Sequence, residues 1–283
     1  MDNTPGLCKE EMVVPVPILL YHSITDDATP RYRRWTVSPA MFAAQLAYLH
    51  EHHYTPITVS QLVHAFSDTT QLPSRPIVLT FDDGLADFYT NALPILAKHH
   101  FRATLYITTG YVGGTSRWLA ALGEGERPML QWSQLSEIDA AGIECDAHSH
   151  THPQLDTLPR AVARDEIIRS KMLLEQRLGR AVLSFAYPYG YHTATIRQMV
   201  HEAGYTSACA VKHALSSSTD NPFSLARIMI TADLSLDSFA DLVAGHGIGV
   251  APVRERLRTK GWRCVRRTVA QLKRGQAVVS GGH

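Results

Sequence analysis

Short apolar runs and longer amphipathic segments alternate along this chain of 283 residues. Apolar runs bounded by turn residues predict strands, and segments with apolar side chains three or four residues apart predict helices. Their alternation favours a parallel sheet with helices outside it, although periodicity alone does not separate a closed barrel from an open sheet. Ser60 and Ser133 are predicted N-caps, and Gly179 is predicted to end the longest helix. The predicted strands are 18–21, 76–81, 103–108, 143–146, 182–185, 206–211 and 225–230, and the predicted helices are 39–53, 61–66, 92–100, 134–141, 160–178 and 193–203.

Length and composition agree with one α/β domain that buries a large core. The formal net charge of +1 makes no case for nucleic acid or for an acidic polymer as a partner. The four cysteines lie far apart, without the paired spacing of a disulfide framework or a zinc ribbon. No run approaches the roughly 20 apolar residues that cross a bilayer. The N-terminal residues lack a secretory pattern, so cytoplasmic residence is the simplest expectation, although a protein trimmed of its signal would look similar.

The pentapeptide Thr80-Phe81-Asp82-Asp83-Gly84 places two adjacent carboxylates at the end of a predicted buried strand. Adjacent side chains on an extended chain point to opposite sides, so one carboxylate could bind a metal ion while the other accepts a proton. Two carboxylates this close repel each other unless a cation or a donor compensates them. The alternative is a solvated turn, because Asp and Gly are common turn residues.

Three histidines, His148, His150 and His152, follow the predicted strand at 143–146. Neutral imidazole is the commonest protein ligand for zinc-like ions, and histidines four residues apart lie on one face of a helical turn. In an extended segment all three side chains would share a face instead. One Asp with two His is typical of a catalytic metal site, whereas closed structural zinc sites normally have four protein ligands. The acidic and histidine segments together predict a divalent metal site.

The strand that ends in Thr80–Gly84, followed by His148-Ser149-His150-Thr151-His152, resembles the polysaccharide deacetylase family, also described as chitooligosaccharide-deacetylase-like carbohydrate esterases. A third segment, Phe185–Gly190, resembles the aromatic wall that this family has beside its metal. The resemblance covers roughly residues 15–245, with the three motifs in the family's order. It implies a distorted (β/α) barrel of about seven strands, with the motifs at the carboxyl ends of the strands.

By this resemblance, Asp83, His148 and His152 bind the metal ion, and Asp82 is the general base that takes a proton from water. His150 falls at a position that the family leaves variable. We expect His150 to lie behind the ligands or to face solvent. The alternative is that His150 takes the place of one of the ligands. The ligand set suits zinc, but cobalt, nickel, manganese or iron could occupy the same geometry.

Aromatic residues are predicted to border the bound substrate. The resemblance implies that the backbone N–H of Tyr189 helps to hold the oxyanion of the tetrahedral intermediate, in a wall that includes Tyr187 and Pro188. A glycine-rich segment at 110–125 is expected to form a loop over the site, where Trp118 could stack on a sugar ring. Burial of Trp118 in the core is the alternative.

The chain departs from the commonest family pattern at two places. Ala186 stands where most members have an arginine, and no Leu-x-His segment, the family's source of the general acid, appears late in the sequence. Near the N-terminus, however, an apolar run ends in Leu20-Tyr21-His22. This resembles the circularly permuted arrangement of the biofilm poly-N-acetylglucosamine deacetylases, in which His22 would be the general acid. The alternative is a histidine that caps the first strand.

The missing arginine would leave Asp82 without a cation that orients it and keeps its pKa low. Arg227 lies inside the apolar run at 225–230, and an arginine there needs a buried partner or an exit to solvent. Arg227 is therefore the candidate replacement, and an arginine on an edge strand that faces water is the alternative.

Three regions are expected: a flexible segment at 1–14, a catalytic domain at 15–250, and a basic helix with a frayed tail at 251–283. The C-terminal segment surrounds apolar residues with Arg and Lys, which is typical of a basic amphipathic helix. Such a helix rests on an anionic membrane or nucleic acid, or packs on its own domain by its apolar side. The apolar residues are Leu257, Trp262, Val265, Val269 and Leu272.

These features predict a metal-dependent N-deacetylase that hydrolyses an acetamido group on a glucosamine-type sugar or an amino-sugar-containing metabolite. Two alternatives stay open. One is hydrolysis of a non-sugar amide or formamide on the same barrel. The other is a catalytically silent carbohydrate-binding homologue, which would have no need to retain both the base and the ligands.

Overall fold

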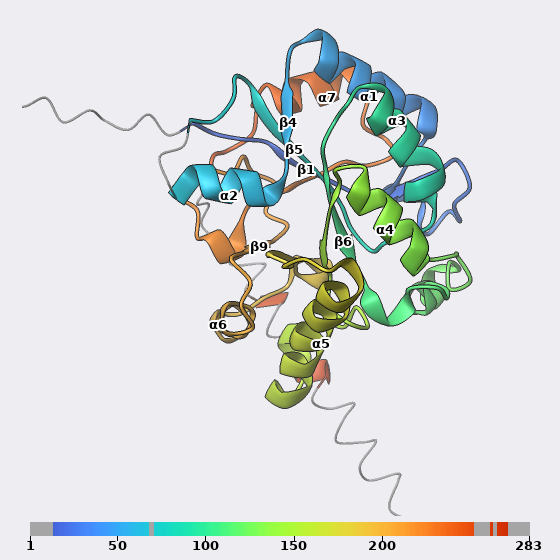
Figure 1. Ribbon diagram of the computed structural model, residues 1–283, viewed down its shortest axis with the longest axis vertical. Coiled ribbons are helices and arrows are strands. Elements are labelled where there is room, and N and C mark those ends of the chain that lie inside the picture. The colour runs from blue at the N-terminus through green and yellow to red at the C-terminus, as the bar shows by residue number, and fades with distance from the viewer. Residues whose placement is uncertain (1–13, 68–70, 252–260, 263–264, 271–283) are drawn as a thin grey trace, which may run out of the picture.

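The computed structural model describes residues 14–67, 71–251, 261–262 and 265–270 (Figure 1). The predicted flexible segment at 1–14, apart from Val14, and the predicted frayed end of the tail lie outside these residues.

The main sheet is curled, and all its paired strands are parallel. Its order is β10-β1-β5-β6-β7-β8-β9, with β4 paired to β5 beside this path. A parallel bridge between Cys209 and Leu225 brings the two ends of the sheet together, and the predicted distorted single-domain barrel is confirmed. The strands are β1 (Ile18–Tyr21), β4 (Thr55–Ile57), β5 (Pro76–Phe81), β6 (Thr104–Ile107), β7 (Glu144–Ala147), β8 (Ser184–Ala186), β9 (Ser207–Cys209) and β10 (Ile228–Met229).

Helices surround the sheet, because each parallel connection must cross over from one strand to the next. One group packs α1 against α3 and α7, and another packs α5 against α4 and α6. Figure 1 shows α1, α3 and α7 at one end of the molecule and α5 and α6 at the other. The helices are α1 (Pro39–Glu51), α2 (Val59–Ser67), α3 (Leu93–Lys98), α4 (Trp132–Ala140), α5 (Arg160–Leu178), α6 (Ala194–Glu202) and α7 (Leu236–Val243).

Successive residues of β5 face opposite sides of the sheet, as in any strand. Leu79 belongs to the main hydrophobic core, whereas Val78 packs in a second core with Cys209 of β9. Thr80 and Asp82 continue the row that Val78 begins. The strand therefore delivers an acid to its carboxyl end on the side of the second core.

Two predicted N-caps are wrong, because another polar side chain precedes each of them. In the place predicted for Ser60, Thr58 Oγ1 accepts a hydrogen bond from the first turn of α2 (3.3 Å). Gln131 caps α4, so Ser133 lies inside the helix. The prediction also missed β4 and a small sheet of β2 (Ser23–Ile24) and β3 (Thr36–Val37), whose short lengths show little periodicity. It missed α7 as well, although the buried Phe239, Leu242 and Val243 of that helix lie at helical spacing.

The C-terminal helical segment does not pack as predicted. Arg266 is buried, whereas Trp262, Val265 and Val269 are exposed by 55%, 51% and 44%. Packing of the helix by its apolar side is therefore wrong for these three residues, and the predicted contacts of Leu257 and Leu272 lie outside the described residues. In the described part of the chain, no helix combines the length and apolar character needed to span a bilayer.

Candidate metal centre and active site

The predicted functional side chains gather where neighbouring parallel strands end. Asp82 and Asp83 follow β5, His22 follows β1, and His148 follows β7 and opens the histidine loop (148–152). Parallel neighbours end at the same edge of a sheet, where such folds place their sites. The structure therefore brings together the acids and histidines of the separate motifs.

Asp83 leaves the extended conformation directly after β5. Its φ of 79° is left-handed, which costs free energy for a residue other than glycine. Asp82 Oδ2 consequently lies 3.7 Å, and Asp83 Oδ1 3.6 Å, from Nε2 of His148. Both carboxylates face the same imidazole, so the expectation that they point to opposite sides is wrong.

Glu166 of α5 holds the histidine loop in a strained form. Ser149 and His152 both have positive φ, of 63° and 59°. Glu166 Oε2 accepts hydrogen bonds from the N–H groups of His150 (2.9 Å) and Thr151 (2.7 Å), and Oε1 accepts one from the Thr151 hydroxyl (2.5 Å). Three bonds to one buried carboxylate therefore support the loop between the two predicted ligands.

A backbone carbonyl orients the ring of His148. Its Nδ1 lies 2.8 Å from the oxygen of Ala186, and because a carbonyl only accepts, Nδ1 carries the proton. Burial lowers the pKa of His148 to about 4, although the charge of Asp82 opposes the shift. The ring is thus neutral at pH 7, and Nε2 presents a lone pair to the two carboxylates.

Lone pairs that converge in a buried site are unfavourable unless a cation lies among them. Asp83 Oδ1 has no hydrogen-bond partner among the described residues, and it lies 3.6 Å from Nε2 of His148 and 3.3 Å from Nε2 of His152. Ligand atoms bound to a tetrahedral zinc at about 2.0–2.1 Å are about 3.4 Å apart. The buried set of Asp83, His148 and His152 therefore fits a divalent ion of this size.

Two further side chains of ligand type near this segment, His150 and Cys145, have other contacts. Nδ1 of His150 lies 2.9 Å from the hydroxyl oxygen of Thr109, and Cys145 is a buried free thiol within the core. The N–H of Gly110 donates to the carbonyl oxygen of His150 (2.7 Å), and a Cβ at Gly110 would lie 2.6 Å from that oxygen. His150 thus joins the histidine loop to a neighbouring loop that requires glycine.

Arg227 binds Asp82 through a buried, two-point salt bridge. Nη1 donates to Oδ1 (2.7 Å) and Nη2 to Oδ2 (2.8 Å), while Nη1 also donates to Thr80 Oγ1 (3.2 Å) and Nε to the carbonyl of Ala210 (3.1 Å). Burial is the largest influence and favours protonation of Asp82, but the charge and hydrogen bonds of Arg227, together with the nearby histidines, hold the pKa of Asp82 below its usual value. Of the two alternatives for Arg227, the structure shows the buried partner.

His22 lies near the same acids. Burial lowers its pKa, and the charges of Asp83 and Asp82 oppose that shift. Its Nδ1 is buried without a hydrogen-bond partner among the described residues. The position suits proton transfer, and the role of general acid stays a prediction.

Aromatic rings border the ligand set. The ring of His152 lies 5.2 Å from that of Trp118, which is half-buried, and 4.7 Å from that of Tyr189, which is 48% exposed. Tyr187 is fully buried and donates its hydroxyl to a backbone carbonyl (2.9 Å), and Pro188 is also buried. In contrast to the prediction, Tyr187 and Pro188 support the wall from behind, and the exposed ring belongs to Tyr189.

Arg127 joins the segment after β1 to the loop that carries Trp118. It donates to Ser23 (3.0 Å), Asp87 (3.1 Å) and Glu124 (3.0 Å). No motif indicated this network. Glu166 was also missed, although its charge at a buried position of α5 was a signal in the sequence.

Comparison with known proteins shows a similarity to polysaccharide deacetylases. Residues 69–208 match the family model described as polysaccharide deacetylase. The chain is 24% identical over 238 residues to YxkH of Bacillus subtilis, whose name assigns it provisionally to the polysaccharide deacetylases, with 84% of this chain and 79% of YxkH covered. It is 23% identical over 210 residues to the poly-beta-1,6-N-acetyl-D-glucosamine N-deacetylase of Staphylococcus aureus, with 71% of this chain and 70% of that protein covered.

A solved structure supports the same assignment. The deacetylase PplD of Streptococcus pyogenes, in complex with acetate, superimposes with a TM-score of 0.71 at 27% identity. The match covers 82% of this chain and 99% of PplD. The predicted resemblance to polysaccharide deacetylases is confirmed.

Proposed function

We propose that this chain, which contains a polysaccharide deacetylase domain, is a metal-dependent hydrolase that removes the N-acetyl group from an N-acetylglucosamine-type sugar. The observation that carries the proposal is the buried convergence of Asp83, His148 and His152 beside an ionised Asp82. A silent binding protein would gain nothing from this arrangement, because converging lone pairs and left-handed backbone both cost free energy.

Asp83, His148 and His152 would hold the ion. When bound, a divalent ion supplies Lewis acidity, which polarises a carbonyl oxygen and makes water more acidic. The carbonyl of Ala186 keeps the lone pair of His148 Nε2 directed at this position.

Asp82 is suited to accept the proton of the attacking water. Arg227 binds both of its oxygens and keeps the carboxylate ionised and oriented. His22, at the end of the neighbouring strand, would protonate the departing amine nitrogen from its imidazolium form, which the charges of Asp83 and Asp82 favour against burial. The N–H of Tyr189 would donate to the oxyanion as the acetyl carbon becomes tetrahedral.

The substrate class rests on the surroundings and on the relatives. The half-buried Trp118 and the exposed Tyr189 both offer rings beside His152, and such rings suit the apolar faces of sugars. The named S. aureus relative acts on poly-N-acetylglucosamine, and PplD was solved with acetate, the acid that N-deacetylation releases. These similarities favour an amino sugar over a non-sugar amide.

The test is acetate release from N-acetylglucosamine oligomers of one to six units, with and without a chelator. We expect release that stops on chelation and returns when zinc, cobalt or manganese is added. Formate or ammonia release from non-sugar amides in place of acetate would support the other hydrolase. Oligomer binding without any product would indicate a silent homologue and contradict the proposal.

A further inference from the structure

The C-terminal helical segment (265–270) holds the domain through Arg266. Nη2 of Arg266 donates to Asp156 Oδ2 (3.0 Å), and Nη1 donates to Oδ1 of the same carboxylate (3.3 Å) and to Oε1 of Gln154 (3.0 Å). The side chains of Arg266 and Asp156 are 7% and 0% exposed. A buried fork of this kind is geometrically specific, because lysine cannot reproduce it.

The same guanidinium stacks on Tyr191. Its central carbon lies 3.4 Å from the centre of the Tyr191 ring, well within the range of cation–π contact. The ring of Tyr191 stacks in turn near that of Tyr189, at 6.1 Å and 21°. Tyr189 contacts the ring of His152 at 4.7 Å. A row of rings therefore runs from Arg266 to the candidate metal centre.

Arg266 thus joins two segments that border this centre. Asp156 lies four residues after His152, in the connection to α5, and Tyr191 directly follows the aromatic wall. Neither residue lies in the sheet, so strand pairing does not fix their relative positions. One side chain from the C-terminal segment spans both.

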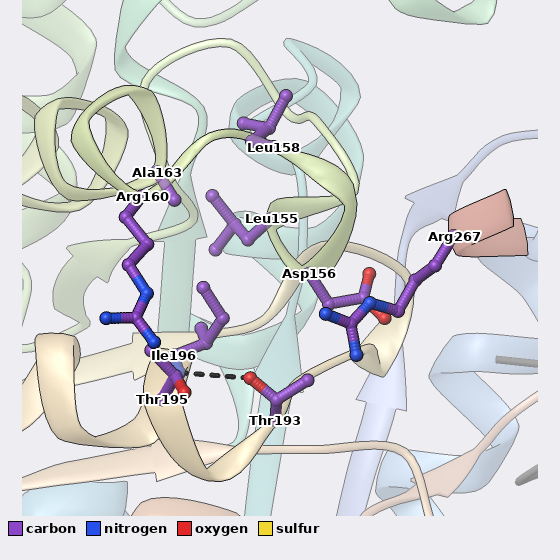
Figure 2. Close-up of a pocket in the computed structure, with 9 residues that line it drawn as sticks. All are labelled: Leu155, Asp156, Leu158, Arg160, Ala163, Thr193, Thr195, Ile196 and Arg267. Atoms are coloured by element: carbon purple, nitrogen blue, oxygen red, sulfur yellow. Dashed lines mark hydrogen bonds between the residues drawn. The ribbon is translucent and has the colours of Figure 1, made fainter. Parts of the chain in front are cut away.

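Close side-chain packing contributes little beside the contact of Arg266 with Asp156. A cavity of about 130 Å³ lies among the short connection at 155–158, α5, α6 and the C-terminal segment. Figure 2 shows Asp156 and Arg267 on one side of this cavity and Arg160 on the other. The outward direction of Trp262, Val265 and Val269 agrees with attachment by polar contact.

We propose that Arg266 is a positioning residue of the substrate site, and the inference rests on the function proposed above. It sets the ring of Tyr191 for contact with the substrate. Tyr191 lies one ring further from the centre than Tyr189. It is therefore placed to contact the sugar unit next to the one that loses its acetyl group.

Hydrogen exchange of the full chain tests the positioning without requiring activity. Arg266→Ala should accelerate exchange in 153–157 and in 187–192. Arg266→Lys should retain protection at 153–157, where its charge still pairs with Asp156, and lose it at 187–192, where the planar stack is gone. Arg267→Ala, a neighbouring exposed arginine on the same segment, is the matched control and should leave both segments unchanged.

Kinetics on substrates of different length test the contact with a second sugar. Contacts made equally in the ground state and the transition state change KM alone. For six-unit substrates, Arg266→Ala and Arg266→Lys should therefore raise KM about tenfold at nearly constant kcat. The single sugar should be unaffected, and Arg267→Ala should match the wild type at every length.

Unchanged exchange in Arg266→Ala, or an equal KM change at all substrate lengths, would overturn the inference. A fall in thermal stability alone, without the length dependence, would also reject the contact with a second sugar. If the wild type releases acetate from no oligomer, the proposed function itself fails. The exchange pattern would still show whether Arg266 orders the two segments.

Discussion

Two buried arginine–aspartate pairs serve different parts of this molecule. Arg227 and Asp82 meet inside the curled sheet, with contacts of 2.7 and 2.8 Å. Arg266 and Asp156 meet where the C-terminal segment contacts the domain, with contacts of 3.0 and 3.3 Å. The first pair borders the candidate metal ligands, whereas the second borders Tyr191.

The surroundings of each pair decide whether its two charges become hydrated when the pair separates. The central pair is enclosed by strands, with Arg227 fully buried and Asp82 nearly so, and the two charges cannot separate into bulk water unless the barrel unfolds. The outer pair can separate when a short helical segment detaches, and both charges then become hydrated. The same interaction thus controls the ionisation of a reacting group at one place and the order of surface segments at the other.

Asp82→Asn should have the largest effect, because it removes the base and leaves the metal ligands intact. We expect acetate release to fall by about 10²–10⁴-fold, the range for loss of a general base. Metal analysis of the same variant should find wild-type occupancy. Activity equal to that of the wild type would refute the role of Asp82.

Arg227→Met should lower the free energy of unfolding by about 3–5 kcal/mol, since it leaves Asp82 buried without a counter-charge. Urea unfolding measures the change. The double variant Arg227→Met/Asp82→Asn is the control and should recover part of the stability, because no unpaired charge stays buried. A single variant as stable as the wild type would show that the central pair opens to water.

Glu166→Ala should weaken metal binding by about 10–100-fold, the usual range for residues that support ligands from behind. Glu166→Gln retains an acceptor for the N–H groups of His150 and Thr151 and should lie between alanine and wild type. Competition with a chromogenic chelator gives the affinities. Equal affinity of all three proteins would mean that the histidine loop keeps its shape without Glu166.

Asp156→Asn should have the smallest effect and is the direct counterpart of Asp82→Asn. The same substitution at the outer pair should change kcat less than about threefold and stability by less than ~2 kcal/mol, because local detachment hydrates Arg266. Acetate release and urea unfolding provide both values. A loss as large as that of Asp82→Asn would remove the distinction between the two pairs.

The central pair could be partly predicted from sequence, and the outer pair could not. Short-range patterns place Asp82 directly after one predicted strand and Arg227 inside another, and the absent arginine at Ala186 creates the need for a substitute. For the outer pair, Arg266 is one of many basic residues in its segment, and no periodic signal distinguishes it. Side-chain packing between distant segments selects it.

The same limit explains the errors at the site. Asp83 lies in a motif that predicted its identity as a ligand, but not its left-handed backbone, which reverses the expected direction of its carboxylate. Tyr187 and Tyr189 are the same residue type in the same short segment, so residue type alone does not show which of them is exposed. Their burial differs because Tyr189 itself has a positive φ of 60°. Residue type thus indicated the chemistry, and local backbone conformation decided which side chain faces the site.

Metal content of the purified wild type, compared with Asp82→Asn, His148→Ala and His152→Ala, tests the central claim most directly. Protein prepared without added metal and then equilibrated with one equivalent of zinc should retain about one ion per chain in the wild type and in Asp82→Asn. The two histidine variants should lose it on dialysis. Retention by the histidine variants, or no retention by the wild type, would contradict the Asp83, His148 and His152 site.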